Sequence, residues 1–341
     1  RKPNSAGIER GKFNDIRFQI DENGSRKNHI NSETSVVSFG DSYTFCRQVE
    51  DSQTWQIYLS KALDDKVLNF GNGNYGVDQA LLRYKREKLP ETTKLVILGF
   101  VPETICRIHS YWKHYLEFGN TFAFKPRFTF KNGKLKLHKN LISGFEDIHN
   151  IEKIINKAQE HDVFYERKFK RLQFRFPYML SYLFNLKRNT VLLYFLIKRK
   201  LFSIFNISKS EIENAPFSKI MHENIKDSHR MYSEKEACDL LEAILLEFCR
   251  HAEEQGHTPL LLLMPQLLDM QIIQKTKFSP YEEFFNKISK TIPLIDMTHY
   301  LNNSNLNDLY TDDVYGGHFS DYGNKQVADR IFKHIKNELI I

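Results

Sequence analysis

Two short segments near opposite ends of the chain carry residue types that could form a nucleophilic site. The segment 36–45 is a β-prone apolar run that breaks into Gly-Asp-Ser, with Ser42 as the last of the three. It places a hydroxyl at a strand end, where open α/β sheets hold reactive groups. The segment 313–320 supplies Asp313 and His318. A hydroxyl, an imidazole and a carboxylate are the parts of a nucleophile, a base and an orienting acid.

The order of these residues resembles that of the GDSL or SGNH hydrolase family, whose first block is Gly-Asp-Ser and whose last block carries Asp and His. The segment 69–79 is similar to the family's Asn-x-Gly-x-x-Gly turn, and the apolar run 95–100 stands where the third block begins. The resemblance covers about 30–110 and 255–335. It implies an α/β fold with three layers (α/β/α) and a mostly parallel central sheet, as in flavodoxin-like folds.

The second and third blocks depart from the family pattern. Asn74 stands where the family has its oxyanion-hole glycine. The group needed there is a backbone N–H, and asparagine tolerates the left-handed conformation. Glu103 replaces the family's donor asparagine, and an ionised carboxylate cannot donate a hydrogen bond. Three alternatives stay open: Glu103 is protonated, Thr104 donates instead, or this corner binds something else.

The last block departs in the position of its acid. The family places Asp three residues before the histidine, and that position is Tyr315 here. Asp313 is our predicted triad acid and Asp312 the second choice, because the two glycines before His318 let the backbone loop. Alternatively, both aspartates cap the final helix or face solvent.

The resemblance implies acyl transfer from an ester, without a metal or other cofactor. Ser42 attacks the carbonyl, His318 takes the proton and Asp313 orients the imidazole. The expected substrate is an acylated carbohydrate or polysaccharide, with acetyl as the expected group. An O-acetyltransferase of a surface polysaccharide and a catalytically silent glycan-binding module are the alternatives. The predicted oxyanion hole is Ser42, Asn74 and Thr104, and the predicted substrate-binding residues are Asp41, Glu103 and Tyr315.

The elements that must position these residues follow from periodicity. β-prone runs lie at 36–39, 66–70, 94–100 and 258–264, separated by helical patterns. A capping box at 233–236 leads into a helix that stops at Gly256, and a terminal helix is expected at 326–340. The segment 125–139 is typical of a β-hairpin, and an irregular or hairpin-like entry with a turn signal at 20–24 is expected within 1–30.

The predicted domain organisation has an extension, a core and an insertion. An N-terminal extension at 1–30 precedes an α/β core formed by 31–145 and 230–341, and a helical basic insertion occupies 146–229. A chain of 341 residues that is 41% hydrophobic is long enough for one large domain or a domain with an insertion. The four cysteines lack metal or redox spacing, and His109 and His114 lack a clear third ligand.

The insertion concentrates the positive charge of the chain. The segment 167–209 holds eleven Lys or Arg and no Asp or Glu, and subtracting these from the overall +7 leaves −4 elsewhere. Aromatic residues lie between the bases. Three interpretations follow: an anionic membrane surface as partner, a lid that binds an anionic glycan, or a subdomain that packs its aromatics inward. Nucleic acid is not expected, because no binding motif accompanies the charge.

The cellular location follows only from the resemblance. The chain begins at Arg1 rather than Met, which is compatible with an upstream signal or anchor. Relatives of this type modify bacterial surface polysaccharides, so the expected location is the bacterial periplasm or its membrane.

Overall fold

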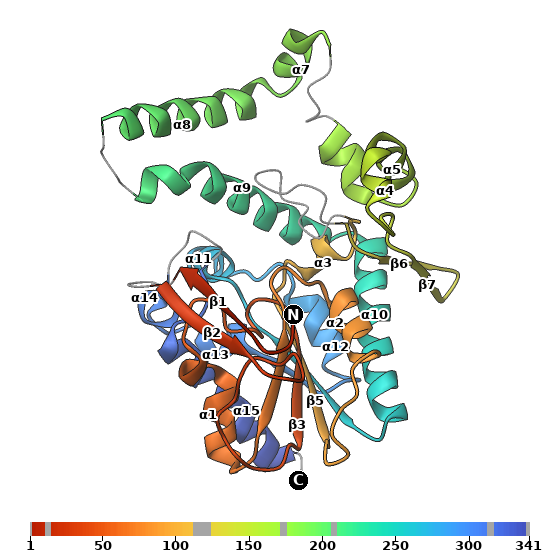
Figure 1. The fold of residues 1–341 in the computed structure, drawn as a ribbon, viewed down its shortest axis with the longest axis vertical. Coiled ribbons are helices and arrows are strands. Elements are labelled where there is room, and N and C mark those ends of the chain that lie inside the picture. Colours follow the sequence, from red (N-terminus) through yellow and green to blue (C-terminus); the bar gives the residue numbers. More distant parts are fainter. Residues whose placement is uncertain are drawn as a thin grey trace.

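A five-stranded parallel sheet lies at the centre of the molecule (Figure 1). The computed structural model describes residues 2–10, 15–111, 124–170, 176–205, 210–311 and 317–338. The strand order of the sheet is β4-β3-β5-β8-β9, which is the flavodoxin-like order 2-1-3-4-5. The predicted three-layer α/β/α fold is therefore confirmed. The strands are β3 (Val36–Gly40), β4 (Val67–Gly71), β5 (Leu95–Phe100), β8 (Thr258–Leu263) and β9 (Leu294–Asp296).

Helices cover both faces of this sheet, because its strands are apolar on both sides. Val37 and Phe39 belong to one core cluster, while Val36 belongs to the other. The first cluster includes residues of α2 (Val77–Tyr84), α10 (Lys235–Glu254) and α12 (Glu282–Ile288). The second includes residues of α1 (Trp55–Leu63), α11 (Leu267–Thr276), α13 (Met297–Leu301), α14 (Leu306–Leu309) and α15 (Asp321–Glu338).

Helix α10 forms where the sequence predicts it but starts differently. Its N-cap is Glu234, which makes no side-chain capping bond, so the predicted capping box at 233–236 is wrong. The helix is instead held by its apolar face, which is buried against the sheet. Gly256, with φ of +78°, follows its end as expected.

Two hairpins flank the sheet. Strands β1 (Ser5–Arg10) and β2 (Asp15–Ile20) pair antiparallel, so the hairpin-like entry is confirmed, with the turn at 20–24 following the hairpin. Strands β6 (Arg127–Lys131) and β7 (Lys134–His138) form the second hairpin. Asn132 and Gly133 lie between them with φ of +51° and +73°, and positive φ at both positions is what a tight two-residue hairpin turn requires.

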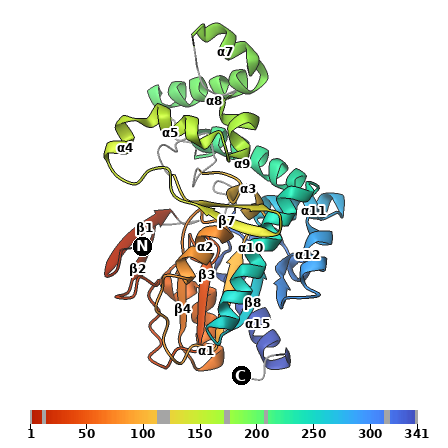
Figure 2. The ribbon, with the colours of Figure 1, turned by 90° about the vertical axis from the view of Figure 1, so that its right-hand side faces the viewer.

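The insertion is helical and extends away from the sheet (Figures 1 and 2). None of the residues of α7 and α8 is fully buried. Among their aromatics, Tyr182, Phe195 and Phe202 are partly buried and Tyr178, Phe184 and Tyr194 are exposed, so inward packing describes only half of them. Among the described residues, no helix is both long and apolar enough to cross a bilayer. The elements are α4 (Glu146–His149), α5 (Ile151–Ala158), η2 (Tyr165–Phe169), α7 (Tyr178–Phe184), α8 (Leu186–Ile204) and α9 (Ser210–Met231).

Candidate active site

The carboxyl end of β3 carries Ser42 on a turn that needs three glycines beneath it. Gly40 pairs with Gly71 of β4 and Gly99 of β5. A Cβ on any of the three would overlap the backbone or side chain of the turn 44–45. The turn can therefore sit directly on the sheet, and the hydroxyl of Thr44 donates to Gly99 O at 2.9 Å. Because β4 and β5 lie on opposite sides of β3, this is the switch point of the sheet, where such folds bind ligands.

Ser42 and His318 meet at this point although they are 276 residues apart in the chain. His318 Nε2 lies 2.8 Å from Ser42 Oγ. The two residues are only 4% and 3% exposed. Tyr43 fixes the imidazole from the side, since its ring centroid is 4.8 Å from that of His318 and its hydroxyl donates to Gly317 O. A hydroxyl at this distance from an imidazole nitrogen is the geometry of a nucleophile and its base.

The other imidazole nitrogen contacts an amide oxygen. His318 Nδ1 lies 3.1 Å from Gln48 Oε1, and the Thr311 hydroxyl donates to the same oxygen at 2.8 Å. An amide oxygen only accepts, so Nδ1 must carry the proton and Nε2 is left to accept from Ser42. Gln48 has φ of +71°, a strained conformation for a residue with a side chain.

The imidazole is neutral at ordinary pH. Burial, followed by the charges of Arg47 and Arg107, lowers the pKa of His318 well below 6.5. A neutral imidazole can accept a proton, as a general base must. Burial also raises the pKa of Tyr43 well above 10, so its hydroxyl stays a donor to Gly317 O.

An ion-paired corner lies beside the nucleophile turn. Asp41 is buried and accepts from Tyr43 N at 2.8 Å and from Val101 N at 3.0 Å. Arg107 lies 3.5 Å from Asp41 and 2.8 Å from Glu103, measured between nitrogen and carboxylate oxygen. Burial raises the pKa of Asp41, and Arg107 opposes this. The Glu103 carboxyl group thus lies against the guanidinium of Arg107, which is four residues later at the end of α3 (Thr104–Arg107).

The remaining predicted oxyanion residues occupy the neighbouring turns. Asn74 has φ of +57°, which is the left-handed conformation that asparagine is expected to tolerate here. Thr104 is fully buried, and its hydroxyl accepts from Val77 N at 3.0 Å, which ties α3 to the start of α2. Accepting this bond leaves the Thr104 hydroxyl its own proton, so the predicted role as a donor to the substrate stays a prediction. Asp312, Asp313 and Tyr315 lie outside the described residues.

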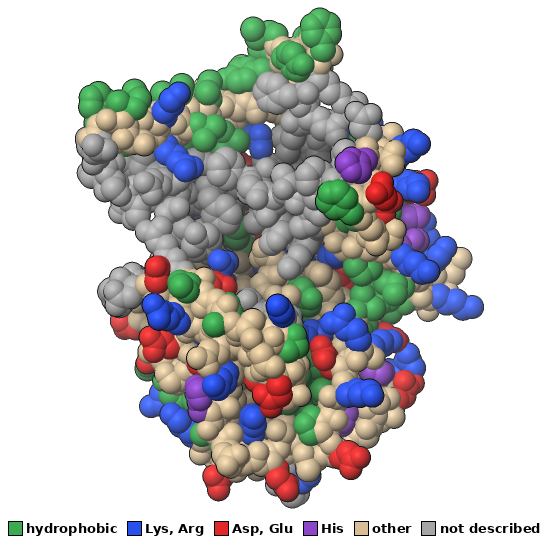
Figure 3. Space-filling model, viewed as in Figure 1, with side chains coloured by type: hydrophobic (Ala, Val, Ile, Leu, Met, Phe, Trp, Pro, Cys, Tyr) green, Lys and Arg blue, Asp and Glu red, His purple; other side chains and the backbone are tan. Residues whose placement is uncertain are grey.

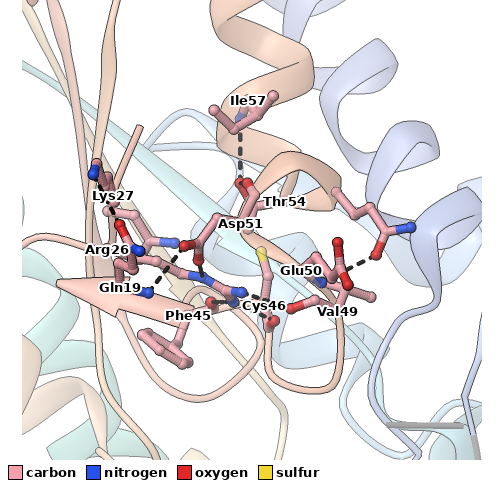
Figure 4. Close-up of polar contacts among 12 residues, drawn as sticks. Gln19, Arg26, Lys27, Phe45, Cys46, Val49, Glu50, Asp51, Thr54 and Ile57 are labelled. Carbon is pink, nitrogen blue, oxygen red and sulfur yellow. Dashed lines mark hydrogen bonds and ion pairs between the residues drawn. The ribbon is translucent and has the colours of Figure 1, made fainter. Parts of the chain in front are cut away.

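Arg26 holds the turn that follows the nucleophile (Figure 4). Its guanidinium donates to the carbonyls of Phe45, Cys46 and Val49 at 2.6–2.7 Å, and its Nε donates to Asp51 at 2.7 Å. These three carbonyls belong to the turn that carries Gln48. Arg26 is 2% exposed, so these bonds compete little with water.

Sequence reasoning missed Gln48, Arg26 and Arg107. Only Arg107 left a signal, namely its i, i+4 spacing from Glu103, which suits an ion pair if the segment is helical. The contacts of Arg26 and Gln48 join segments whose proximity only the folded chain creates. Among the described residues, no cluster of three His, Cys, Asp or Glu could hold a metal ion.

Comparison with known proteins adds a structural likeness. No family model and no curated protein matches this sequence. The chain is similar to the solved structure of a protein from Desulfitobacterium hafniense DCB-2 proposed to be a lipolytic member of the G-D-S-L family. The identity is 14% and the TM-score 0.38, over 88% of this chain and 99% of that chain. At these values the strand order of the sheet remains the basis for the fold, and the site geometry remains the basis for function.

Proposed function

We propose that this protein is a serine hydrolase that cleaves an O-acyl ester, with Ser42 as nucleophile and His318 as general base. The observation that carries the proposal is the 2.8 Å contact between Ser42 Oγ and His318 Nε2 at the switch point of the sheet. A neutral imidazole with its other nitrogen protonated supports the same assignment. A catalytically inactive binding module does not require a serine hydroxyl in contact with a neutral imidazole, so we favour an enzyme.

In the proposed reaction, the Ser42 hydroxyl proton passes to His318 Nε2 while Oγ adds to the ester carbonyl. The backbone N–H groups of Ser42 and Asn74 stabilise the oxyanion, with Thr104 as a further donor. His318 then returns the proton to the leaving alkoxide, and the acyl group stays on Ser42. Water, deprotonated by His318, attacks the acyl-enzyme and releases the acid. Asp41, Glu103 and Tyr315 remain our proposed substrate-binding residues.

Two groups are proposed for the Nδ1 side of the imidazole. Gln48 is the contact present in the structure, and its oxygen fixes the tautomer. Asp313 is the carboxylate that the sequence predicts, and it would also stabilise the imidazolium. Gln48 therefore acts as a positioning residue, and Asp313 as the acid of a complete triad. Substituting each residue separately distinguishes the two contributions.

The enclosure of the site supports a small acyl group. Ser42 and His318 are nearly fully buried, which suits acetyl better than a long chain. The resemblance to the GDSL or SGNH family favours a carbohydrate as the group that bears it. An O-acetyltransferase would use the same acyl-enzyme and replace water by a sugar hydroxyl, and limited access of water to Ser42 supports this second candidate.

The test is the release of p-nitrophenol from p-nitrophenyl acetate by the wild type, Ser42→Ala and His318→Ala. Exposed matched controls are Ser52→Ala and His299→Ala. We expect both site variants to lose at least about a hundredfold in rate, the controls to be unchanged, and mass spectrometry to find acetyl on Ser42. Equal rates in all five proteins would refute the proposal. Two further assays then separate hydrolysis from transfer. Release of acetate from acetylated xylan indicates hydrolysis, and acetylation of an added xylo-oligosaccharide acceptor indicates transfer.

A further inference from the structure

Helices α7 and α8 expose an apolar surface that nothing in the described structure covers. Figure 3 shows hydrophobic side chains gathered along the outer side of these helices, away from the sheet. We define the α7–α8 patch as the large apolar side chains of 176–205 that are 41–84% exposed. They are Phe176, Tyr178, Met179, Leu180, Leu183, Phe184, Leu186, Leu193, Tyr194, Leu196, Ile197, Leu201, Ile204 and Phe205.

The patch on α8 is a continuous stripe. Leu186, Leu193, Ile197 and Ile204 are spaced by 7, 4 and 7 residues along the helix, which places them on one side. Phe195 and other residues of the opposite side are partly buried, and α8 packs there against α9. The helix therefore turns apolar side chains both toward α9 and away from the molecule. The outward stripe is unusual, because soluble monomers rarely expose an apolar patch of this extent.

Positive charges border the stripe. At 100° per residue, Lys187 and Lys198 lie on one side of it and Lys200 on the other. The segment 167–209 contains no acidic residue that could neutralise them. An apolar stripe between cations is the pattern of a helix lying in the interface of an anionic bilayer, with its apolar side among the acyl chains and its bases at the phosphates.

We propose that the α7–α8 patch docks this protein on a lipid bilayer that contains anionic phospholipids. The helices lie on the surface rather than cross it, since none of the described helices is long and apolar enough to span. A second copy of the chain fits less well. A twofold dimer places the same patch on both sides of the interface, so the basic borders of the two copies would repel each other.

Docking would place the carboxyl end of the sheet, which carries Ser42, on the side of the bilayer. The end of α9 and the residue that follows it contact the loop after β5. Ser228 Oγ of α9 donates to Pro102 O at 3.4 Å, and the hydroxyl of Tyr232, just after the helix, donates to the same oxygen at 2.7 Å. Pro102 leads directly into Glu103 and α3. Figures 1 and 2 both show α9 between the carboxyl end of the sheet and the patch. Membrane docking itself is independent of the proposed chemistry.

The experiment is co-sedimentation with vesicles of phosphatidylcholine plus phosphatidylglycerol, compared with phosphatidylcholine alone. The apolar variant is Leu193→Asp with Ile197→Asp, and its matched control is Phe278→Asp, at an exposed phenylalanine outside the insertion. The basic variant replaces Lys187, Lys198 and Lys200 by Gln, and its control replaces the exposed Lys275, Lys290 and Lys333 by Gln. Circular dichroism checks that each variant is folded.

We expect the wild type and both controls to bind the anionic vesicles and to bind neutral vesicles weakly. Each cation near an anionic surface contributes about fivefold in partitioning, so the basic variant should lose about a hundredfold. The apolar variant should lose binding as well. The proposal would be overturned if the wild type did not bind the anionic vesicles, or if each variant bound them as well as its control. A wild-type dimer in analytical ultracentrifugation that the apolar variant disrupts would also overturn it, and would assign the patch to a second copy.

Discussion

The proposed positioning role of Gln48 can be tested by exchanging its amide for a carboxylate. Gln48 Oε1 lies 3.1 Å from His318 Nδ1, so Gln48→Glu would put a negative charge about 4 Å from the centre of the imidazolium. With an effective dielectric constant of about 20, the attraction is about 4 kcal/mol, which raises the pKa of His318. A carboxylate favours the protonated imidazole, and a protonated base is inactive. The acid limb of the activity profile should therefore move to higher pH.

The assay is the pH dependence of kcat/KM with p-nitrophenyl acetate. In the wild type the acid limb should lie well below pH 6.5, since burial lowers the pKa of His318. Gln48→Ala should reduce kcat by about 10²–10⁴ by freeing the tautomer. The control is Gln255→Glu at an exposed position, where solvent screens the charge. An acid limb that stays in place for Gln48→Glu, together with full activity of Gln48→Ala, would refute the positioning role.

Two further predictions concern stability. Arg26→Met should lower the free energy of unfolding by about 3–5 kcal/mol, because it leaves three carbonyls of the nucleophile turn without their donor. Urea unfolding measures this loss, with the exposed Arg17→Met as the control. A loss below about 1 kcal/mol would contradict the prediction. Acidification should also destabilise the protein. Burial lowers the pKa of His109 to about 3 and that of His318 well below 6.5. Below about pH 6.5 the unfolded chain therefore binds protons that the native state does not, and the free energy of unfolding decreases as the pH is lowered. His109→Asn should weaken this pH dependence in urea midpoints at about pH 7 and pH 5, and an unchanged dependence would argue against the assignment.

The basic charge of the insertion was visible in the sequence, but its surroundings were not. Counting residues shows that 167–209 is basic throughout and rich in aromatics. The same composition fits aromatics packed inward and aromatics facing outward, because a helix with apolar residues on several sides can bury any of them. The exposure of α7 and α8 depends on the position of α9, which contacts α3 and packs Met221 and Ile225 against Leu268 of α11.

Local patterns determined the sheet and the place of the nucleophile. The strand runs, the Asn132-Gly133 turn and the stop at Gly256 follow from backbone preferences that neighbouring residues set, and all three are confirmed. The capping box at 233–236 failed because burial of the apolar face of α10 made a cap unnecessary. The position of Ser42 at a strand end was likewise readable from the segment 36–45 alone.

Only the tertiary structure decided how the site is held together. Three contacts join residues that sequence spacing does not relate. His318 contacts Ser42, Gln48 contacts Nδ1 of His318, and Arg26 donates hydrogen bonds to the nucleophile turn. A buried polar group takes whichever partner the packed chain brings within about 3 Å, so its identity depends on the complete fold. The sequence by itself therefore determined which chemistry the chain can carry, and the packing of distant segments determined which side chains support it.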